Sequence, residues 1–223
     1  MLYSARKMRI TGGKFGGRNL KVPKSDAIRP TQDRVREALF NILAPELAGC
    51  DFLDLFAGCG AVGLEALSRG ARSTTFVEQN RRHLAVLNEN LGAVGLPGQG
   101  GRLGQSRRDA LAEQGGHFGQ AGQGEQSAAV VAADCYRYLA TYAGPGFSIA
   151  FADPPYALGE EKGYAQVLAT LAARDVVRPG GLFIAEMTAV QRAEETPGWN
   201  LLRDRTYGKT RLCIWRRLPV GSL

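Results

Sequence analysis

Residues 53–63 read LDLFAGCGAVG. An apolar run leads into a glycine-rich segment, and the residues that follow it, up to Gly70, have the composition of a short helix. Gly58, Gly60 and Gly63 satisfy the spacing G-x-G-x-x-G between this strand and this helix. The spacing alone is weak, because tight turns between a strand and a helix are common. It nevertheless predicts a strand–helix unit whose glycines let a ligand approach the backbone.

Strand-like and helix-like stretches alternate along the rest of the chain. STTFVE, AAVVAAD, FSIAFAD and GGLFIAE read as strands, and NRRHLAVLNENL, YRYLATY and YAQVLATLAARDVV read as helices. This alternation predicts an α/β fold, with a mostly parallel sheet and helices on both faces. Two further strands flank Gly208 and Lys209, so the sheet is expected to receive one antiparallel strand near the C-terminus.

The positive charge of the chain is concentrated at its beginning. The net charge is +7; residues 1–36 hold ten Lys and Arg and two Asp, a net of +8, and the rest of the chain has a net of −1. We expect residues 1–28 to form a basic extension, with a β-hairpin at 8–22, and residues 29–223 to form one large domain. A basic extension on a nearly neutral body favours a polyanionic partner, with a solvated tail as the alternative. The residues expected to contact that partner are Arg9, Lys14, Arg18 and Lys21.

A helix is expected at residues 29–43, where apolar residues recur at helical spacing. Thr31 is the expected N-cap, and Pro45 is expected to end the helix. The apolar face consists of Val35, Leu39, Ile42 and Leu43.

Residues 92–127 do not fit the alternation. They contain eleven Gly and six Gln with few apolar side chains, so they cannot offset the entropy of ordering by burial. We expect a flexible insertion in the domain, either a neutral loop or an additional contact through Arg102, Arg107 and Arg108.

Composition excludes several classes of protein. No apolar run approaches the ~20 residues that span a bilayer, and the first residues lack the apolar core of a secretory signal. The four cysteines are scattered and there are two histidines, so no metal-ligand spacing is present. These features predict a cytoplasmic protein with no membrane association and no metal. No obligate protein partner is evident from the sequence.

Acidic residues stand at the ends of three successive expected strands: Asp54, Glu78 and Asp134. An acid just before the glycine-rich turn would repel a pyrophosphate but suits a cationic ligand. S-adenosylmethionine carries a sulfonium and an ammonium group and no phosphate. Glu78 is placed to hold its ribose and Asp134 its adenine amino group. A single strand-end aspartate is usually a helix cap, but three acids in this order favour the ligand.

Asp153, Pro154, Pro155 and Tyr156 follow the strand FSIAFAD. Asp153 and the Pro154 carbonyl can accept the two N–H groups of a planar amine and turn its lone pair toward a methyl donor. The prolines have no N–H and fix the backbone, so they present that carbonyl rigidly, and Tyr156 can stack on a base. A rigid turn is the alternative reading. A base inside a duplex would have to be flipped out to reach this site.

Beyond these arguments, the chain resembles the bacterial 16S ribosomal RNA guanine-N2 methyltransferases, a family of class I S-adenosylmethionine-dependent methyltransferases. The resemblance rests on MRITGGKFGGRNLKVP, RPTQDRVREALFNIL, LDLFAGCGAVGLEALSRGA, DPPY and YGKTRLCIWRR, and covers nearly the whole chain except 92–127. It implies a seven-stranded sheet and methylation of a guanine in 16S rRNA, within an assembling 30S particle, with S-adenosylhomocysteine as the second product.

The resemblance also implies which residues bind and act. It places Arg29 and Thr31 beside the cofactor pocket and the DPPY residues at the transfer site; many members have Phe in place of Tyr156. The implied cofactor residues are Thr31, Asp54, Phe56, Ala57, Gly58, Gly60, Glu78 and Asp134.

Three other functions remain open from the residues. A DNA adenine-N6 methyltransferase could use the same DPPY, although the chain lacks an obvious target-recognition domain. An NAD-dependent oxidoreductase would use the glycine spacing but leaves Asp54 and DPPY without a role. A non-catalytic RNA-binding protein would use only the basic extension.

Overall fold

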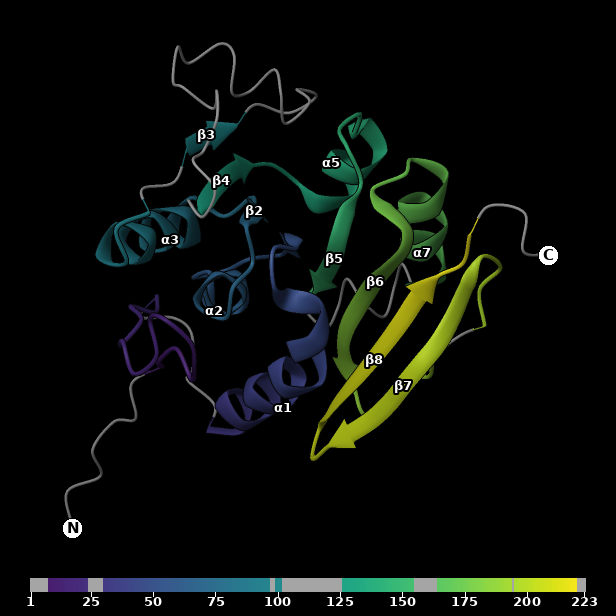
Figure 1. The fold of residues 1–223 in the computed structure, drawn as a ribbon, viewed down its shortest axis with the longest axis horizontal. Helices are drawn as coiled ribbons and strands as arrows, with labels where there is room; N and C mark the ends of the chain where they lie inside the picture. The colour runs from purple at the N-terminus through teal and green to yellow at the C-terminus, as the bar shows by residue number, and fades with distance from the viewer. Residues whose placement is uncertain are drawn as a thin grey trace.

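The structure is a computed structural model that describes residues 8–23, 30–96, 99–101, 126–154, 164–193 and 195–219. Its centre is one sheet with the strand order β3-β4-β2-β1-β5-β6-β8-β7 (Figure 1). The strands are β1 (Asp51–Leu55), β2 (Ser73–Glu78), β3 (Gln99–Gly101), β4 (Ser127–Ala132), β5 (Phe147–Ala152), β6 (Val177–Thr188), β7 (Trp199–Tyr207) and β8 (Thr210–Arg217). The helices are α1 (Pro30–Leu47), α2 (Ala61–Ser68), α3 (Arg81–Ala93), α5 (Cys135–Thr141) and α7 (Tyr164–Ala173).

The strand directions confirm the predicted α/β fold. From β3 to β6 neighbouring strands pair in parallel, and β8 pairs antiparallel with both β6 and β7. The predicted hairpin is therefore present, with its turn at Gly208, where φ is 61°. The implied number of seven strands is exceeded by one, because β3 adds to the edge beside β4.

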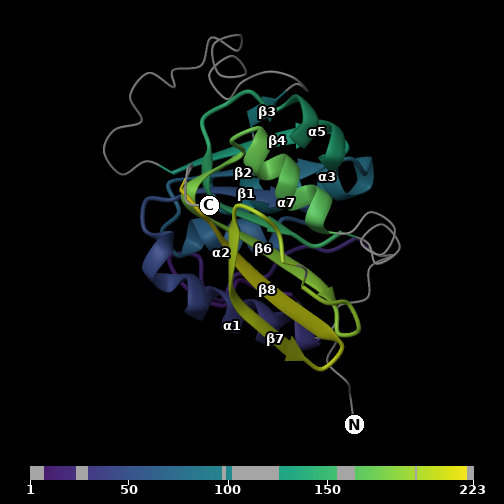
Figure 2. The ribbon, with the colours of Figure 1, turned by 90° about the vertical axis from the view of Figure 1, so that its right-hand side faces the viewer.

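Helices cover both faces of the sheet (Figures 1 and 2). One core cluster joins the sheet to α5 and α7 through residues such as Tyr138, Leu168 and Phe183, and another joins it to α1 through Leu39 and Ile184. Every residue of β1, β2 and β5 is buried. Burial on both faces explains why β5, FSIAFA, reads as a nearly continuous apolar run rather than as an alternating pattern.

The helix α1 differs from its prediction at both ends. It begins at Pro30, so Thr31 lies in the first turn and is not the cap residue, in keeping with the preference of proline for the first helical position. It continues through Pro45 to Leu47, so the predicted stop is wrong. Leu43 and Leu47 are buried on either side of Pro45, and their burial offsets the hydrogen bond that proline removes.

Part of the predicted insertion is regular structure. The helix α3 continues to Ala93, and Val94 is buried against the same core. β3 lies near the beginning of the segment and pairs in parallel with β4. Its glycine-rich sequence gave no strand signal, because the pairing comes from the neighbouring edge of the sheet. Arg102, Arg107 and Arg108 lie outside the described residues.

Residues 8–23 pack against α2 and α3 as a compact segment. An antiparallel bridge joins Arg9 to Asn19, where the sequence predicted a hairpin. Met8, Ile10, Phe15 and Leu20 are buried in one cluster with side chains of α2, α3 and β2. The basic segment is therefore held in a fixed position beside the domain.

Among the residues that the structure describes, no helix has the length and apolar character needed to cross a membrane. Within the same ranges, no three His, Cys, Asp or Glu side chains are grouped so that they could hold a metal ion.

Candidate active site

A cavity of about 480 Å³ opens at the carboxyl edge of the sheet. Its wall includes the loop after β1, the ends of β2, β5 and β6, the beginning of α3 and one residue of α1. The carboxyl edge of a parallel sheet is where α/β proteins bind ligands, since the connecting loops converge there.

Among the residues that the structure describes, four acids line this cavity from four neighbouring strands: Glu78, Asp54, Asp153 and Glu186. The strand order β2-β1-β5-β6 and the pairing of Asp54 with Phe151 and of Ala152 with Ala185 place them in one row. The sequence predicted the first three as site residues. Glu186 was missed, although GGLFIAE ends in an acid as the other strands do.

Asp54 is almost completely buried, with 1% of its surface exposed. Its Oδ2 accepts a hydrogen bond of 2.8 Å from the Gly63 N–H, at the beginning of α2. Burial raises the pKa of Asp54 to about 7; the Gly63 N–H opposes this shift and the charge of Glu78 adds to it. The site therefore holds a carboxyl group whose ionised form a cation would stabilise.

Glu78, the last residue of β2, holds the glycine-rich loop in place through hydrogen bonds. Its Oε2 accepts from the Gly58 N–H at 2.9 Å, and its Oε1 accepts from the Asn80 N–H at 2.7 Å. The Nδ1 atom of His83, in the first turn of α3, lies 3.7 Å from Oε2. The carboxylate is thus fixed at the mouth of the loop, and His83 is a cavity residue that the sequence did not indicate.

The loop itself has little room for side chains. Phe56, Ala57 and Gly58 line the cavity, and the Phe56 backbone is left-handed with φ of 59°. Gly60 does not line the cavity; it precedes α2 with φ of 83°, and a Cβ there would lie 2.4 Å from Leu87. A Cβ at Gly63 would lie 2.3 Å from the ring of Phe76. Glycine is therefore required here by the turn and by close packing.

Asp134 lies outside the cavity wall. Its Oδ1 accepts from the Arg137 N–H at 2.9 Å, so it caps α5. The structure thus shows Asp134 as the N-cap of α5. Tyr136, from the same helix, lies edge-on to Phe56, with 5.9 Å between the ring centroids.

Asp153 and Pro154 line the cavity directly after β5. Asp153 is partly exposed and Pro154 is buried. Pro155, Tyr156 and Arg29 lie outside the described residues, as does the side chain of Thr31.

Arg36 reaches the cavity from α1, although the helical pattern placed it off the apolar face. It is buried, and its Nη2 donates to Asp33 Oδ1 at 3.0 Å and to the Arg9 carbonyl at 2.5 Å. Its Nε donates to the fully buried Glu65 at 3.4 Å. Arg36 therefore connects α1, α2 and the N-terminal segment beside the cavity. The helical periodicity of the sequence does not indicate such a role.

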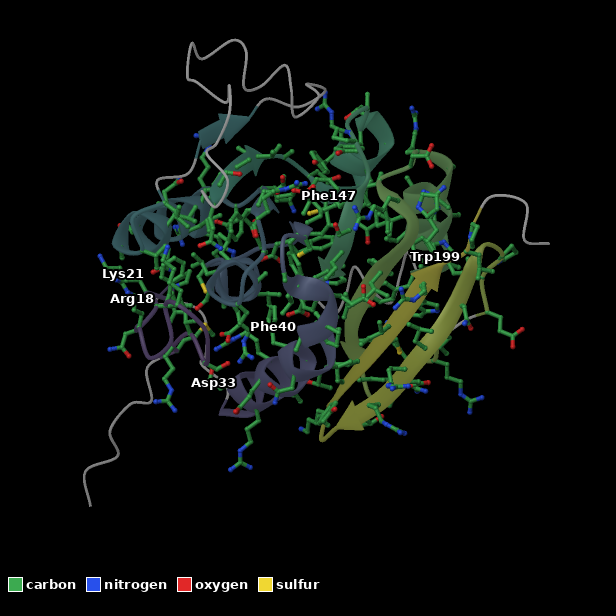
Figure 3. The ribbon with its side chains drawn as sticks, in the orientation of Figure 1. Arg18, Lys21, Asp33, Phe40, Phe147 and Trp199 are labelled. Atoms are coloured by element: carbon green, nitrogen blue, oxygen red, sulfur yellow. The ribbon has the colours of Figure 1, made fainter. Side chains whose placement is uncertain are left out.

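The four basic residues predicted to contact a polyanion are all exposed on the N-terminal segment. Lys21 forms an ion pair of 2.6 Å with Glu89, and Arg18 donates to the Ala93 carbonyl at the end of α3. Figure 3 shows both side chains beside α3. Lys14 lies over the ring of Phe15, 5.4 Å from its centroid. The structure brings these charges onto one segment next to the cavity residue Met8.

Comparisons with known proteins agree with this architecture. The family described as conserved hypothetical protein 95 matches residues 8–121 and 117–216. Ribosomal RNA small subunit methyltransferase D of Escherichia coli (strain K12) is 32% identical over 217 residues, which cover 97% of this chain and 93% of that protein. The protein of the same description from Haemophilus influenzae is 30% identical and covers 91% of this chain and 90% of its own.

Solved structures show the same fold. A protein from Escherichia coli superposes with a TM-score of 0.73 at 30% identity, covering 96% of this chain and 99% of that one. A protein from Haemophilus influenzae superposes with a TM-score of 0.69 at 26% identity, covering 96% and 100%. The chain therefore belongs to the conserved hypothetical protein 95 family and is a relative of the ribosomal RNA small subunit methyltransferase D proteins.

Proposed function

We propose that this protein transfers a methyl group from S-adenosylmethionine to the exocyclic N2 amine of a guanine in the 16S rRNA of the small ribosomal subunit. The observation that carries the proposal is one cavity lined by buried strand-end acids at one end and by Asp153 and Pro154 at the other. Such a cavity holds a cationic donor and an amine acceptor next to each other. The similarity to small-subunit methyltransferases over most of the chain supports RNA as the source of that amine.

The cavity residues fit S-adenosylmethionine. Asp54, buried and with a raised pKa, gains stability as a carboxylate when a cation lies beside it. Glu78 is positioned to accept from ribose hydroxyl groups, while the backbone of Phe56, Ala57 and Gly58 lines the same wall. A dinucleotide would bring a pyrophosphate toward two acids, so NAD fits this site poorly. When bound, the cofactor supplies an electrophilic methyl group.

Asp153 and Pro154 orient the amine. An exocyclic amine on a base is a poor nucleophile, because its lone pair is delocalised into the ring. In our proposal the carboxylate accepts one N–H and the Pro154 carbonyl accepts the other, which directs the lone pair toward the methyl group. Orientation of this kind can contribute up to ~7–11 kcal/mol to lowering a barrier. In the same proposal, Asp153 takes the released proton.

The base has to leave its stack to reach the cavity, and the exposed basic residues of the N-terminal segment are placed to hold the flanking phosphates. Phosphate contacts fix the register of the RNA and carry no base specificity by themselves.

A methylation assay on three substrates tests the proposal. Purified protein and labelled S-adenosylmethionine are incubated with duplex DNA, free 16S rRNA and 30S particles, and the labelled nucleoside is identified. N2-methylguanine in rRNA, free or in the particle, is the expected product. Label recovered only in DNA as N6-methyladenine would replace our proposal with the adenine alternative.

Cofactor affinity is expected to fall as the pH drops through about 7, where Asp54 takes up a proton in the free protein. A cationic ligand binds the ionised carboxylate, so below this pH binding must displace the proton. The dissociation constant should then rise by up to about tenfold for each pH unit. Calorimetry between about pH 5.5 and pH 7 measures this dissociation constant. Because histidine side chains usually titrate in the same range, a histidine variant serves as a control.

Two variants separate the contributions to this profile. Asp54→Asn should bind weakly with little pH dependence, whereas His83→Gln should keep the dependence. A wild-type profile as flat as that of Asp54→Asn would contradict the assignment.

Neutralising Arg9, Lys14, Arg18 and Lys21 together is expected to weaken RNA binding and to flatten its salt dependence. Each lost phosphate contact should reduce the log–log slope by roughly 0.7–0.9. Because Lys21 and Arg18 already have partners on α3, Lys14→Ala should lower the slope at least as much as Lys21→Ala. Arg174→Ala, exposed at the opposite edge of the sheet, is the matched control. An unchanged slope in the fourfold variant would leave the segment with no role in RNA binding.

A further inference from the structure

Glu186 lies at the end of the cavity where the amine is proposed to bind. It lines the same cavity as Asp153 and Pro154, near the end of β6. The β5–β6 register pairs Ala152 with Ala185, so Asp153 and Glu186 are the next residues on two neighbouring parallel strands. Paired strands lie about 4.8 Å apart, which sets the spacing at which the two side chains begin.

The two acids also belong to the same face of the sheet. On β6, Leu182 and Ile184 pack in the α1 cluster, whereas Phe183 and Ala185 pack toward α5 and α7. Alternation therefore puts Glu186 on the α1 face. On β5, Ile149 and Phe151 pack in the α1 cluster, and the same alternation would place Asp153, the first residue after this strand, on that face as well.

The backbone at Glu186 is fixed from α7. The hydroxyl of Tyr164 donates to the Glu186 carbonyl at 2.7 Å, and the Tyr164 ring lies 6.2 Å from that of Phe183. Burial raises the pKa of Tyr164, and the charges of Asp153 and Glu186 act on it in the same direction. The tyrosine is therefore kept as a hydroxyl donor, and both carboxylates lie within electrostatic reach of it.

Guanine and adenine differ in the atom next to the amine. In guanine the ring atom N1 carries a hydrogen and is a donor. In adenine the corresponding N1 has a lone pair and is an acceptor. An ionised carboxylate has only acceptor oxygens. It therefore stabilises the N1–H of guanine and repels the N1 lone pair of adenine. When Asp153 and Pro154 hold the amine, the neighbouring N1–H of guanine needs a further acceptor.

We propose that Glu186 accepts the N1–H of the target guanine and thereby selects guanine over adenine. This inference rests on the proposed function, since it needs the amine to be bound at Asp153. The DPPY residues can bind the amine of guanine or that of adenine, so they do not select the base. A contact from Glu186 to N1 would supply that selection.

2-Aminopurine tests the contact directly, because it keeps the C2 amine but has a lone pair at N1. The substrate is a small-subunit rRNA fragment, prepared by ligation, with guanine or 2-aminopurine at the mapped target position. Loss of one hydrogen bond to a charged group should make wild-type methylation of 2-aminopurine roughly 10- to 100-fold slower than that of guanine. Glu186→Gln should reduce this preference to a few-fold, because its amide can donate to N1 as well as accept. Intrinsic differences between the amines cancel when the two preferences are divided.

Glu46→Gln, at an exposed acid of α1 that pairs with Arg216, is the matched control and should keep the wild-type preference. Equal preferences in wild type and Glu186→Gln would overturn the inference, as would wild-type protein that methylates both bases at the same rate. If the variant fails to fold, equal wild-type rates on the two bases still overturn the inference. Wild-type protein that leaves guanine unmethylated would instead refute the proposed function itself.

Discussion

Asp153→Ala is expected to lose most methyl transfer while keeping its affinity for S-adenosylmethionine and for RNA. Asp153 lies at the end of the cavity proposed for the substrate, and β1 separates it from Glu78 at the end proposed for the cofactor. Removing its carboxylate takes away one acceptor for the amine and the nearest candidate to receive the proton. The expected loss in kcat is roughly 10²–10⁴-fold, the range for positioned acid–base groups.

Single-turnover assays with labelled cofactor measure this loss, and calorimetry checks cofactor binding. Asp153→Asn keeps one acceptor oxygen without the charge, so an intermediate rate is expected. Asp175→Asn, an exposed acid at the opposite edge of the sheet, should retain the wild-type rate. Turnover of Asp153→Ala equal to that of the wild type would remove Asp153 from the mechanism.

Among the substitutions proposed for this protein, Glu65→Ala is expected to lower the free energy of unfolding most. Glu65 is fully buried in α2 and accepts from the Thr11 N–H and hydroxyl, both at 2.7 Å, and from the Gly12 N–H at 2.9 Å. It also pairs with Arg69 at 2.8 Å and with Arg36 at 3.4 Å. Alanine would leave buried donors and a buried guanidinium without this acceptor, which should lower the free energy of unfolding by about 3–5 kcal/mol.

Urea unfolding measures this change, with Glu89→Ala as the control. Glu89 pairs with Lys21 on the surface, and such a pair contributes about 0–1 kcal/mol. Equal losses in the two variants would contradict the central role of Glu65. Because Arg36 lines the cavity and donates to Glu65, Glu65→Ala should also weaken cofactor binding, which connects the N-terminal segment with the cofactor site.

The fold could be predicted from the sequence because its central strands are buried on both faces and its turns carry glycine. The strand–helix alternation predicted the parallel sheet, and the two residues Gly208 and Lys209 predicted the terminal hairpin. β3 could not be predicted, since its three residues have no strand propensity and pair only because the edge of β4 is adjacent. The end of α1 was missed because local proline chemistry was outweighed by the burial of Leu47.

The sequence indicated cavity-lining residues where they lie at or next to a strand end, as Asp54, Glu78 and Asp153 do. Asp134 has the same position in the sequence pattern, but it does not line the cavity, and its Oδ1 accepts from the Arg137 N–H as the N-cap of α5. Its role toward the cofactor stays a prediction. Arg36 could not be found, because its importance comes mainly from contacts with Glu65 and the Arg9 carbonyl, which are distant from it in the chain. Glu186 carried the same signal as the other strand-end acids and was overlooked.

The central claim is that the cavity methylates the N2 amine of a guanine in small-subunit rRNA. Mass spectrometry of 16S rRNA from a wild-type strain and a strain that lacks this protein tests it most directly. We predict one N2-methylguanine that is present in the wild type, absent in the deletion strain and restored by adding purified protein and S-adenosylmethionine. Identical methylation of the 16S rRNA in both strains would contradict the claim.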